Sequence, residues 1–575
     1  ALAYSQIIKR FPYGGGGYVV ATELLGPRFG VVSGSALLVD YVLTISVSIA
    51  SGADQVFSVL PPGWVHWKVL AEAIVIALLV LMNLRGVKES VTILAPIFGL
   101  FLLLHAFLIL VGIGAHAGAI GPTASNVATG FRQGLGTIGL LGMGAIFLRA
   151  YSMGAGTYTG IEAVSNGIQI MREPKVETAR TTMTYMAISL SLTAGGILIL
   201  YLLYQVHPQP GQTMNAVLLR NFIQRVPVGG WFVALTLASE AALLFVAAQA
   251  GFVDGPRVMS SMALDSWLPH RFSQISDRLS MANGVMLMGA AALLTLFYTK
   301  GDITTLVTMY SINVFVTFSL SQAGMLRFWR RTRQAGRKRG VAIHGVAFLL
   351  CVSILAGVLY EKFLLGGWVT VVVTTTIIAL CFWFRSRYRR VRDQFRQLNQ
   401  VFDDVPAADA AEPVALDHKK PTAVLFVGSY SGLGIHALLT LQKLFPGFYR
   451  NFLFVSIGVI DAATLHGVEE VDRLRKQTED GLRRYVGLAR KMGLSADYRM
   501  EIAPDALVAA EDLAVAISKE FPRAVFYLGK LVFQEPTWLE RLLHNRTAEN
   551  IQQKLQFMGL NSMILPARVT EKKVG

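Results

Sequence analysis

Long apolar segments separated by short polar connections make up the first two thirds of the chain. Ten of these segments approach or exceed the length of about 20 residues that a bilayer-spanning helix needs. They are residues 31–60, 69–83, 90–114, 140–171, 183–206, 231–253, 284–298, 303–325, 341–359 and 368–384. A shorter apolar run at residues 1–8 indicates the end of another membrane helix, and we expect one further helix before Ala1. The pattern therefore predicts an α-helical polytopic membrane domain of twelve helices that ends near residue 390.

The pattern changes to shorter alternating runs beyond this point. We expect a charged linker over residues 391–420 and an α/β domain over residues 421–575. The predicted strands are residues 422–427, 452–459, 496–502, 524–528 and 562–565, and the predicted helices are residues 468–491, 504–521 and 537–558. Strands that alternate with helices of this length are typical of a parallel sheet.

The composition agrees with a membrane protein and excludes a soluble enzyme. Hydrophobic residues make up 53% of the chain and charged residues only 15%, whereas about a quarter of a soluble domain is charged. Cys351 and Cys381 both lie in apolar segments, which favours packing over a disulfide or a thiolate metal site.

The net charge of +16 comes from basic residues that concentrate in alternate connections. The positive-inside rule explains this distribution without a nucleic acid partner. It places the connections at residues 61–67, 116–133, 207–228 and 361–367 outside the cell. Both ends of the chain, and with them the α/β domain, are then expected in the cytoplasm.

Asp40 is the clearest chemical signal in the membrane domain, because an ionisable group in an apolar helix is costly and usually functional. Tyr41, Thr44, Ser48 and Ser51 follow it at spacings that gather hydroxyl groups on one side of a helix. A carboxylate beside neutral oxygens is what a small cation needs when it loses its hydration shell. The pattern predicts a cation site.

A second signal is the glycine-rich stretch that ends at Glu162. Gly154, Gly156 and Gly160 make a continuous helix unfavourable there, and an interrupted membrane helix can turn carbonyl groups and helix ends toward a solute. The alternative is that these small residues merely permit close packing of helices.

Several short motifs resemble those of the amino acid-polyamine-organocation permease superfamily. They are Arg10-Phe11-Pro12-Tyr13-Gly14-Gly15-Gly16-Gly17-Tyr18, Thr159-Gly160-Ile161-Glu162-Ala163, Asp254-Gly255-Pro256-Arg257 and Asp265-Ser266-Trp267-Leu268-Pro269. Other motifs resemble KimA-type potassium importers of the KUP family. They are Asp40-Tyr41 with Thr44 and Ser48, Ala163-Val164-Ser165-Asn166, and Tyr310 with the later Ser319-Leu320-Ser321-Gln322-Ala323-Gly324-Met325. The resemblance covers about residues 1–390.

This resemblance implies an inverted-repeat permease fold of five plus five helices followed by two more. The fragment at Ala1 would be the second helix, and the first helix would supply ligands that this sequence does not contain. The residues implied to line potassium sites are Asp40, Tyr41, Thr44, Ser48, Thr159 and Tyr310. Glu162 is the implied proton-coupling carboxylate.

The implied function is potassium uptake across the bacterial plasma membrane as potassium/proton symport, with no enzymatic activity and no cofactor besides the transported ions. The α/β domain resembles universal-stress-protein-like domains, which implies a homodimer, and the importer family implies cyclic di-AMP as an effector. Two rival functions stay open: a proton-coupled amino-acid or amine permease, and a membrane-anchored nucleotide sensor.

Structural explanations stay open for several of these residues. Asp40 could pair with a base such as Arg149, and Tyr310 could be ordinary packing. Glu240 is a further intramembrane acid without an assigned role, and His105 suits a packed or interfacial position better than a ligand position.

The turn Gly428-Ser429-Tyr430-Ser431-Gly432-Leu433-Gly434 follows the first predicted strand of the α/β domain. Its backbone amides could cradle a phosphate at a helix N-terminus. It could equally be a tight turn that only packs the domain.

Overall fold

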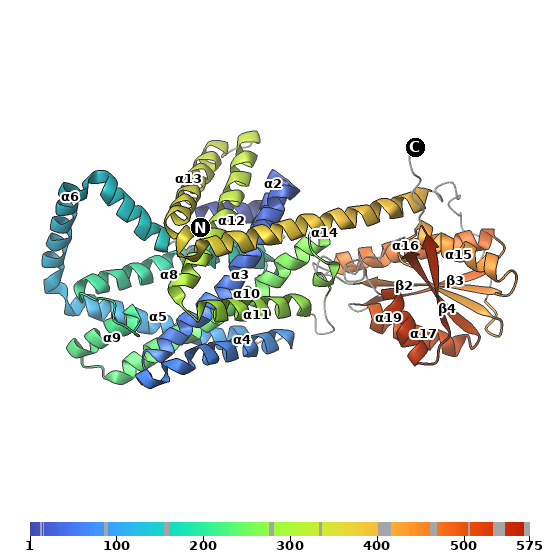
Figure 1. Cartoon of the computed structure of the whole chain (residues 1–575), viewed down its shortest axis with the longest axis horizontal. Helices are drawn as coiled ribbons and strands as arrows, with labels where there is room; N and C mark the ends of the chain where they lie inside the picture. The colour runs from blue at the N-terminus through green and yellow to red at the C-terminus, as the bar shows by residue number, and fades with distance from the viewer. Residues whose placement is uncertain are drawn as a thin grey trace. The chain divides into compact units, whose positions relative to one another are not determined.

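The computed structural model describes residues 1–11, 14, 16–85, 90–154, 160–274, 281–332, 336–400, 416–459, 468–503, 506–532 and 547–568 (Figure 1). The chain divides into two compact units. The first comprises Ala1–Met262 and Met281–Cys381, and the second comprises Ala263–Ser280 and Phe382–Gly575.

The described secondary structure of the first unit is helical, and its helices α10 and α14 continue into the second unit. The helices are α1 (Leu2–Arg10), α2 (Gly17–Leu25), α3 (Pro27–Phe57), η1 (Pro62–Trp67), α4 (Lys68–Leu84), α5 (Ser90–Ala115), η2 (Ala117–Ala119), α6 (Ile120–Gly154), α7 (Gly160–Asn166), η4 (Gly167–Ile170), α8 (Lys175–Leu203), α9 (Met214–Arg225), α10 (Gly230–Leu264), α11 (Ala282–Thr299), α12 (Ile303–Arg331), α13 (Arg337–Lys362), η6 (Phe363–Gly367) and α14 (Trp368–Gln400). In the part of the chain that the structure describes, ten helices are long and apolar enough to cross a membrane. The predicted polytopic membrane protein is confirmed.

The centre of this unit is formed by α3 and α12. In the most apolar stretch of each helix, 78% of the residues of α3 and 67% of those of α12 are buried, whereas none are buried in α6. Small residues let other helices approach α3 closely: a Cβ atom added to Gly34 would lie only 2.7 Å from the Tyr18 ring on α2. The most buried helices are therefore the ones that carry Asp40 and Tyr310.

Two connections predicted to lie outside the membrane are largely helical. The connection expected at residues 116–133 belongs mostly to α6, which begins at Ile120, and the one at residues 207–228 contains α9. The first residues of α6 are polar, so an apolar pattern detects only its second half. Gly139 separates the two halves with φ 70° and ψ 178°, which produces the bend of α6 in Figure 1.

The second unit contains one parallel five-stranded sheet, as predicted. Its strands are β1 (Thr422–Phe426), β2 (Asn451–Val459), β3 (Ser495–Ala503), β4 (Ala524–Val532) and β5 (Ser562–Arg568), in the order β3-β2-β1-β4-β5. Its other helices are η5 (His270–Phe272), α15 (Gly432–Leu444), α16 (Val468–Lys491), α17 (Ala506–Glu520) and α19 (Thr547–Phe557). In register, Thr422 of β1 lies opposite Asn451 of β2 and Ala524 of β4.

Both faces of the sheet are covered by helices (Figure 1). Leu425 and Phe454 pack in one core with residues of α15 and α16, whereas Val424 and Leu453 pack in a second core with residues of α17 and α19. Because side chains alternate between the faces of a strand, neighbouring residues of β1 and β2 serve opposite cores. The continuous apolar runs of these strands follow from this arrangement.

Candidate functional site

Most of the predicted α3 stripe is buried inside the helical unit. Asp40 is 5% exposed, Tyr41 and Ser48 are also buried, and Thr44 is half-buried. The Oδ1 atom of Asp40 has no hydrogen-bond partner among the described residues. A buried carboxylate oxygen without a partner is unfavourable unless a proton or a cation neutralises the group.

Glu162 lies in the first turn of α7 and is 4% exposed. Its Oε1 atom accepts a hydrogen bond of 2.8 Å from the backbone amide of Gly17, the first residue of α2. The free amides of a helix N-terminus favour a negative charge at this position. The carboxylate therefore joins α7 to α2.

Gly17 is surrounded so closely that a side chain would not fit. An added Cβ atom would lie 2.3 Å from Thr317 Cγ2, 2.9 Å from Glu162 Oε1 and 3.1 Å from Ser33 Oγ. Thr317 comes from α12 and Ser33 from α3. Four helices therefore meet at this one glycine.

Asn166, one turn after Glu162, connects α7 to the α3 stripe. Its Nδ2 atom donates a hydrogen bond of 2.5 Å to the hydroxyl of Tyr41. A Cβ atom added to Gly16, the residue before α2, would lie 1.8 Å from Asn166 Oδ1, so the chain at the start of α2 also lies against Asn166. Asp40 is near enough to Glu162 for their charges to interact. The structure thus brings Asp40, Tyr41 and Glu162 together.

The other predicted site residues have different positions. Tyr310 on α12 is buried in the hydrophobic cluster that also contains Leu43 of α3 and Val164 of α7. Thr159 lies outside the described residues. Arg149, the alternative partner of Asp40, forms an ion pair with Glu361 at 3.5 Å.

Asp254 is a third buried carboxylate in this region, and no role for it was predicted from the sequence. It is 4% exposed and its Oδ1 atom lies 3.7 Å from Arg257 Nη1. It is near enough to Glu162 for the two carboxylate charges to interact. The sequence did offer a signal, because Asp254 is an acid next to an apolar segment. It was missed because the segment predicted at residues 231–253 ends one residue before Asp254.

Glu240 and His105 form a separate buried pair. The Nε2 atom of His105 lies 2.9 Å from Glu240 Oε1, and its Nδ1 atom lies 2.8 Å from the carbonyl oxygen of Phe101. Asn215 donates to both oxygens of Glu240 at 3.0 Å, and Tyr201 donates to Asn215 Oδ1 at 2.5 Å. Glu240 therefore differs from Asp40, because its carboxylate is fully hydrogen-bonded within the protein.

The turn after β1 is filled by a side chain from α16. The hydroxyl of Tyr485 accepts a hydrogen bond of 2.9 Å from the amide of Ser431 and lies 3.2 Å from the carbonyl oxygen of Ser429. Burial raises the pKa of Tyr485, so its hydroxyl stays protonated and can donate to that carbonyl. This geometry favours the packing interpretation of the turn over a phosphate cradle.

Comparison with known proteins finds a matching family and several relatives. Residues 1–383 match the model of a family described as amino acid permease. The potassium transporter KimA of Bacillus subtilis (strain 168) is 30% identical over 418 residues, which cover 72% of this chain and 66% of the relative. The chain thus spans about two thirds of the length of that relative.

Two further relatives are more distant. The probable potassium transport system protein Kup 1 of Bifidobacterium longum (strain NCC 2705) is 23% identical over 74% of this chain and 68% of its own length. The low-affinity putrescine importer PlaP of Escherichia coli (strain K12) is 22% identical over 58% of this chain and 71% of its own length.

Proposed function

This chain belongs to the amino acid permease family, and on that premise we propose that it imports potassium together with protons across the bacterial plasma membrane. The relatives named above include the potassium transporter KimA and a probable potassium transport system protein. The proposed mechanism is alternating access, in which an inverted repeat of helices exposes a central site to each side in turn.

The observation that carries this proposal is the buried Oδ1 atom of Asp40, for which the described part of the chain offers no hydrogen-bond partner. Potassium in a membrane protein exchanges water for protein oxygens, and one carboxylate can neutralise its charge. Asp40 provides that charge, and the Tyr41 hydroxyl lies on the neighbouring residue. We include Thr44, Ser48, Thr159 and Tyr310 in the proposed potassium site on the basis of the family resemblance.

Glu162 is the proposed proton-coupling group. When ionised, its carboxylate makes a charge-assisted hydrogen bond to the Gly17 amide, and protonation weakens such a bond. Protonation would therefore loosen the contact between α7 and α2. Because Asn166 of α7 also binds Tyr41, a movement of α7 would reach the potassium site directly.

Uptake of radioactive rubidium into proteoliposomes tests this function. We expect the full-length protein to accumulate rubidium when the outside is acidified, and unlabelled potassium to compete for uptake. Uptake that unlabelled potassium does not reduce, but that putrescine or an amino acid blocks, would contradict the proposal. It would support the permease alternative, with which the similarity to a putrescine importer agrees.

Three finer proposals accompany this function. They are a domain division at residues 1–390, 391–420 and 421–575, a cytoplasmic universal-stress-protein-like domain that responds to cyclic di-AMP, and assembly as a homodimer. The basic residues that flank the membrane helices support the cytoplasmic position. Calorimetry with cyclic di-AMP and light scattering of the purified protein test the last two.

A further inference from the structure

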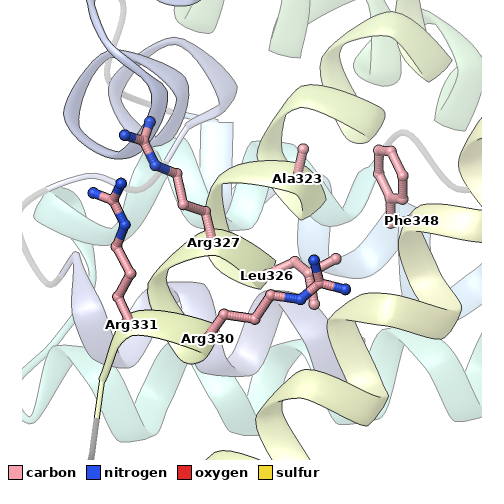
Figure 2. A pocket seen from close by; sticks show the side chains of 6 residues that line it. All are labelled: Ala323, Leu326, Arg327, Arg330, Arg331 and Phe348. Atoms are coloured by element: carbon pink, nitrogen blue, oxygen red, sulfur yellow. The ribbon is translucent and has the colours of Figure 1, made fainter.

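A pocket of about 280 Å³ lies beside the C-terminal end of α12 (Figure 2). Its lining residues on α12 are Ala323, Leu326, Arg327, Arg330 and Arg331, and Phe348 lines it from α13. Positions three and four apart share one side of a helix, so the three arginines and the two apolar residues form one continuous surface. The pocket therefore combines positive charge with an apolar wall.

No acid in the described part of the chain neutralises the charge of the pocket. Arg330 and Arg331 have no hydrogen-bond or ion-pair partner among the described residues. The sequence has no Asp or Glu between Asp302 and Glu361. Within that stretch the basic residues are Arg327, Arg330, Arg331, Arg333, Arg337, Lys338 and Arg339. An anionic ligand would supply the missing counter-charge.

Arg327 has a different role at the edge of the pocket. Its Nη1 atom donates to the carbonyl oxygens of Leu24 at 3.0 Å and Leu25 at 3.5 Å, where α2 ends. A cation at the C-terminal end of a helix is favourable because the last carbonyls there are unpaired. Arg327 is thereby held in place, and Figure 2 shows its guanidinium pointing away from Phe348.

Two contacts between α12 and α13 fix the walls of the pocket. On one side, the Nδ1 atom of His344 lies 2.6 Å from Gln322 Oε1. On the other side, a Cβ atom added to Gly340 would lie 2.4 Å from the ring of Trp329. One contact comes before Ala323 along α12 and the other comes after Leu326. Together they hold α12 and α13 at a defined spacing on either side of the pocket.

Exposed apolar surface continues from the apolar wall along α13. Val352 lies one helical turn beyond Phe348 on the same side of α13 and is exposed, and Leu349 beside Phe348 is also exposed. In Figure 2 the guanidinium of Arg330 lies beside Leu326, on the side of α12 that faces Phe348. A small soluble anion would bind the arginines but would leave this apolar surface uncovered. A phospholipid contacts both, through its headgroup and its acyl chains.

We propose that this pocket binds the phosphate-bearing headgroup of an anionic phospholipid, whose acyl chains lie along the exposed apolar residues of α13. Arginine forms paired hydrogen bonds with phosphate oxygens, and basic pockets between membrane helices on the cytoplasmic side are suited to such headgroups. The bound lipid would stabilise the end of α12, the helix that also carries Tyr310 and Thr317. The proposal concerns binding and does not depend on which solute the protein transports.

Native mass spectrometry of the full chain, with phosphatidylglycerol and phosphatidylcholine of identical acyl chains, measures this binding. R330Q/R331Q removes two charges from the pocket, and A323F fills the pocket while keeping every arginine. K338Q/R339Q is the matched control, because it removes two exposed charges of the same basic cluster outside the pocket. Inorganic phosphate serves as the soluble competitor.

We expect phosphatidylglycerol to bind at least about tenfold more tightly than phosphatidylcholine, because only its headgroup carries net negative charge. R330Q/R331Q and A323F should each lose about tenfold in affinity, while the control changes by less than about twofold. Equal binding of the two lipids, or an equal loss in the control, would overturn the proposal. Displacement of the lipid by millimolar phosphate would also overturn it and assign the arginines to a soluble anion.

Discussion

The carboxylate of Glu162 accepts a hydrogen bond from the backbone amide of Gly17 at 2.8 Å. These residues are 145 positions apart, and their contact joins the short helix α7 to the first residue of α2. Ser33 of α3 and Thr317 of α12 lie against the same glycine. A change of charge on Glu162 therefore acts at the point where four helices meet.

Replacing Glu162 with Gln tests the proposed proton role. The Gln side chain keeps an oxygen that can accept from Gly17, so the fold should persist, but it binds no proton. We expect Glu162→Gln to abolish acid-driven accumulation of potassium while potassium exchange down its own gradient continues. Glu23→Gln, an exposed acid on α2, is the control and should behave as the unmodified protein. Full acid-driven accumulation by Glu162→Gln would refute the role.

Replacing Gly17 with Ala tests the close approach of the helices. The new Cβ atom would lie 2.3 Å from Thr317 Cγ2, so we expect a loss of about 1–3 kcal/mol in stability, typical of overpacking. Gly114→Ala is the control, because nothing lies within 4 Å of a Cβ atom there. Thermal unfolding in detergent measures both variants.

The double variant Gly17→Ala/Thr317→Ser sharpens this test. Serine has no Cγ2 atom, so the closest clash disappears while the hydroxyl remains. We expect the double variant to regain part of the stability that Gly17→Ala loses. A double variant less stable than Gly17→Ala would show that Thr317 is not the limiting neighbour.

Replacing Glu240 with Ala tests whether the second buried acid is structural. Removal leaves His105 and Asn215 without their shared partner, and breaking a buried pair in this way costs about 3–5 kcal/mol. Glu240→Gln keeps an acceptor and should cost less. Both variants, assayed in liposomes at a temperature where they stay folded, should retain acid-driven potassium uptake. Loss of proton coupling in a folded Glu240→Gln protein would instead assign Glu240 to the transport mechanism.

Replacing Tyr485 with Phe tests the packed turn after β1. The Ser431 amide loses its acceptor, and an unsatisfied buried group of this kind costs about 1–3 kcal/mol. Tyr498→Phe is the control: its hydroxyl donates to the partly exposed Glu479 at 2.8 Å, and water can replace that bond. Chemical unfolding of the full chain, monitored in the α/β unit, should show a larger loss for Tyr485→Phe. Equal losses of stability in the two variants would show that the Tyr485 hydroxyl stabilises the turn no more than an exposed hydroxyl does.

The elements predicted best from the sequence are those with a periodic pattern of apolar residues. The predicted helix at residues 468–491 coincides with α16, because its apolar residues recur with helical period on one face. The five strands were also predicted, with shifted ends, because each is a short apolar run between turns. In contrast, the first half of α6 is polar and exposed, so no apolar pattern marked it.

The candidate site was harder to predict, because its contacts join residues far apart in the sequence. Asp40 and Tyr41 stood out as polar residues in an apolar helix, but nothing in the sequence indicated that Asn166 would bind Tyr41. His105 and Glu240, which are 135 residues apart, formed an unforeseen pair for the same reason. Periodicity describes one helix at a time and does not reveal which helices are neighbours.

Potassium uptake by Asp40→Asn tests the central claim most directly. Asp54→Asn is its matched control, because Asp54 lies on the same helix but is ion-paired with Lys68 away from the site. We predict that Asp40→Asn lowers potassium-competed rubidium uptake about a hundredfold, as expected when a binding charge worth roughly 3 kcal/mol is lost, while Asp54→Asn transports normally. Normal uptake by a correctly folded Asp40→Asn protein would contradict the assignment of Asp40 to the potassium site.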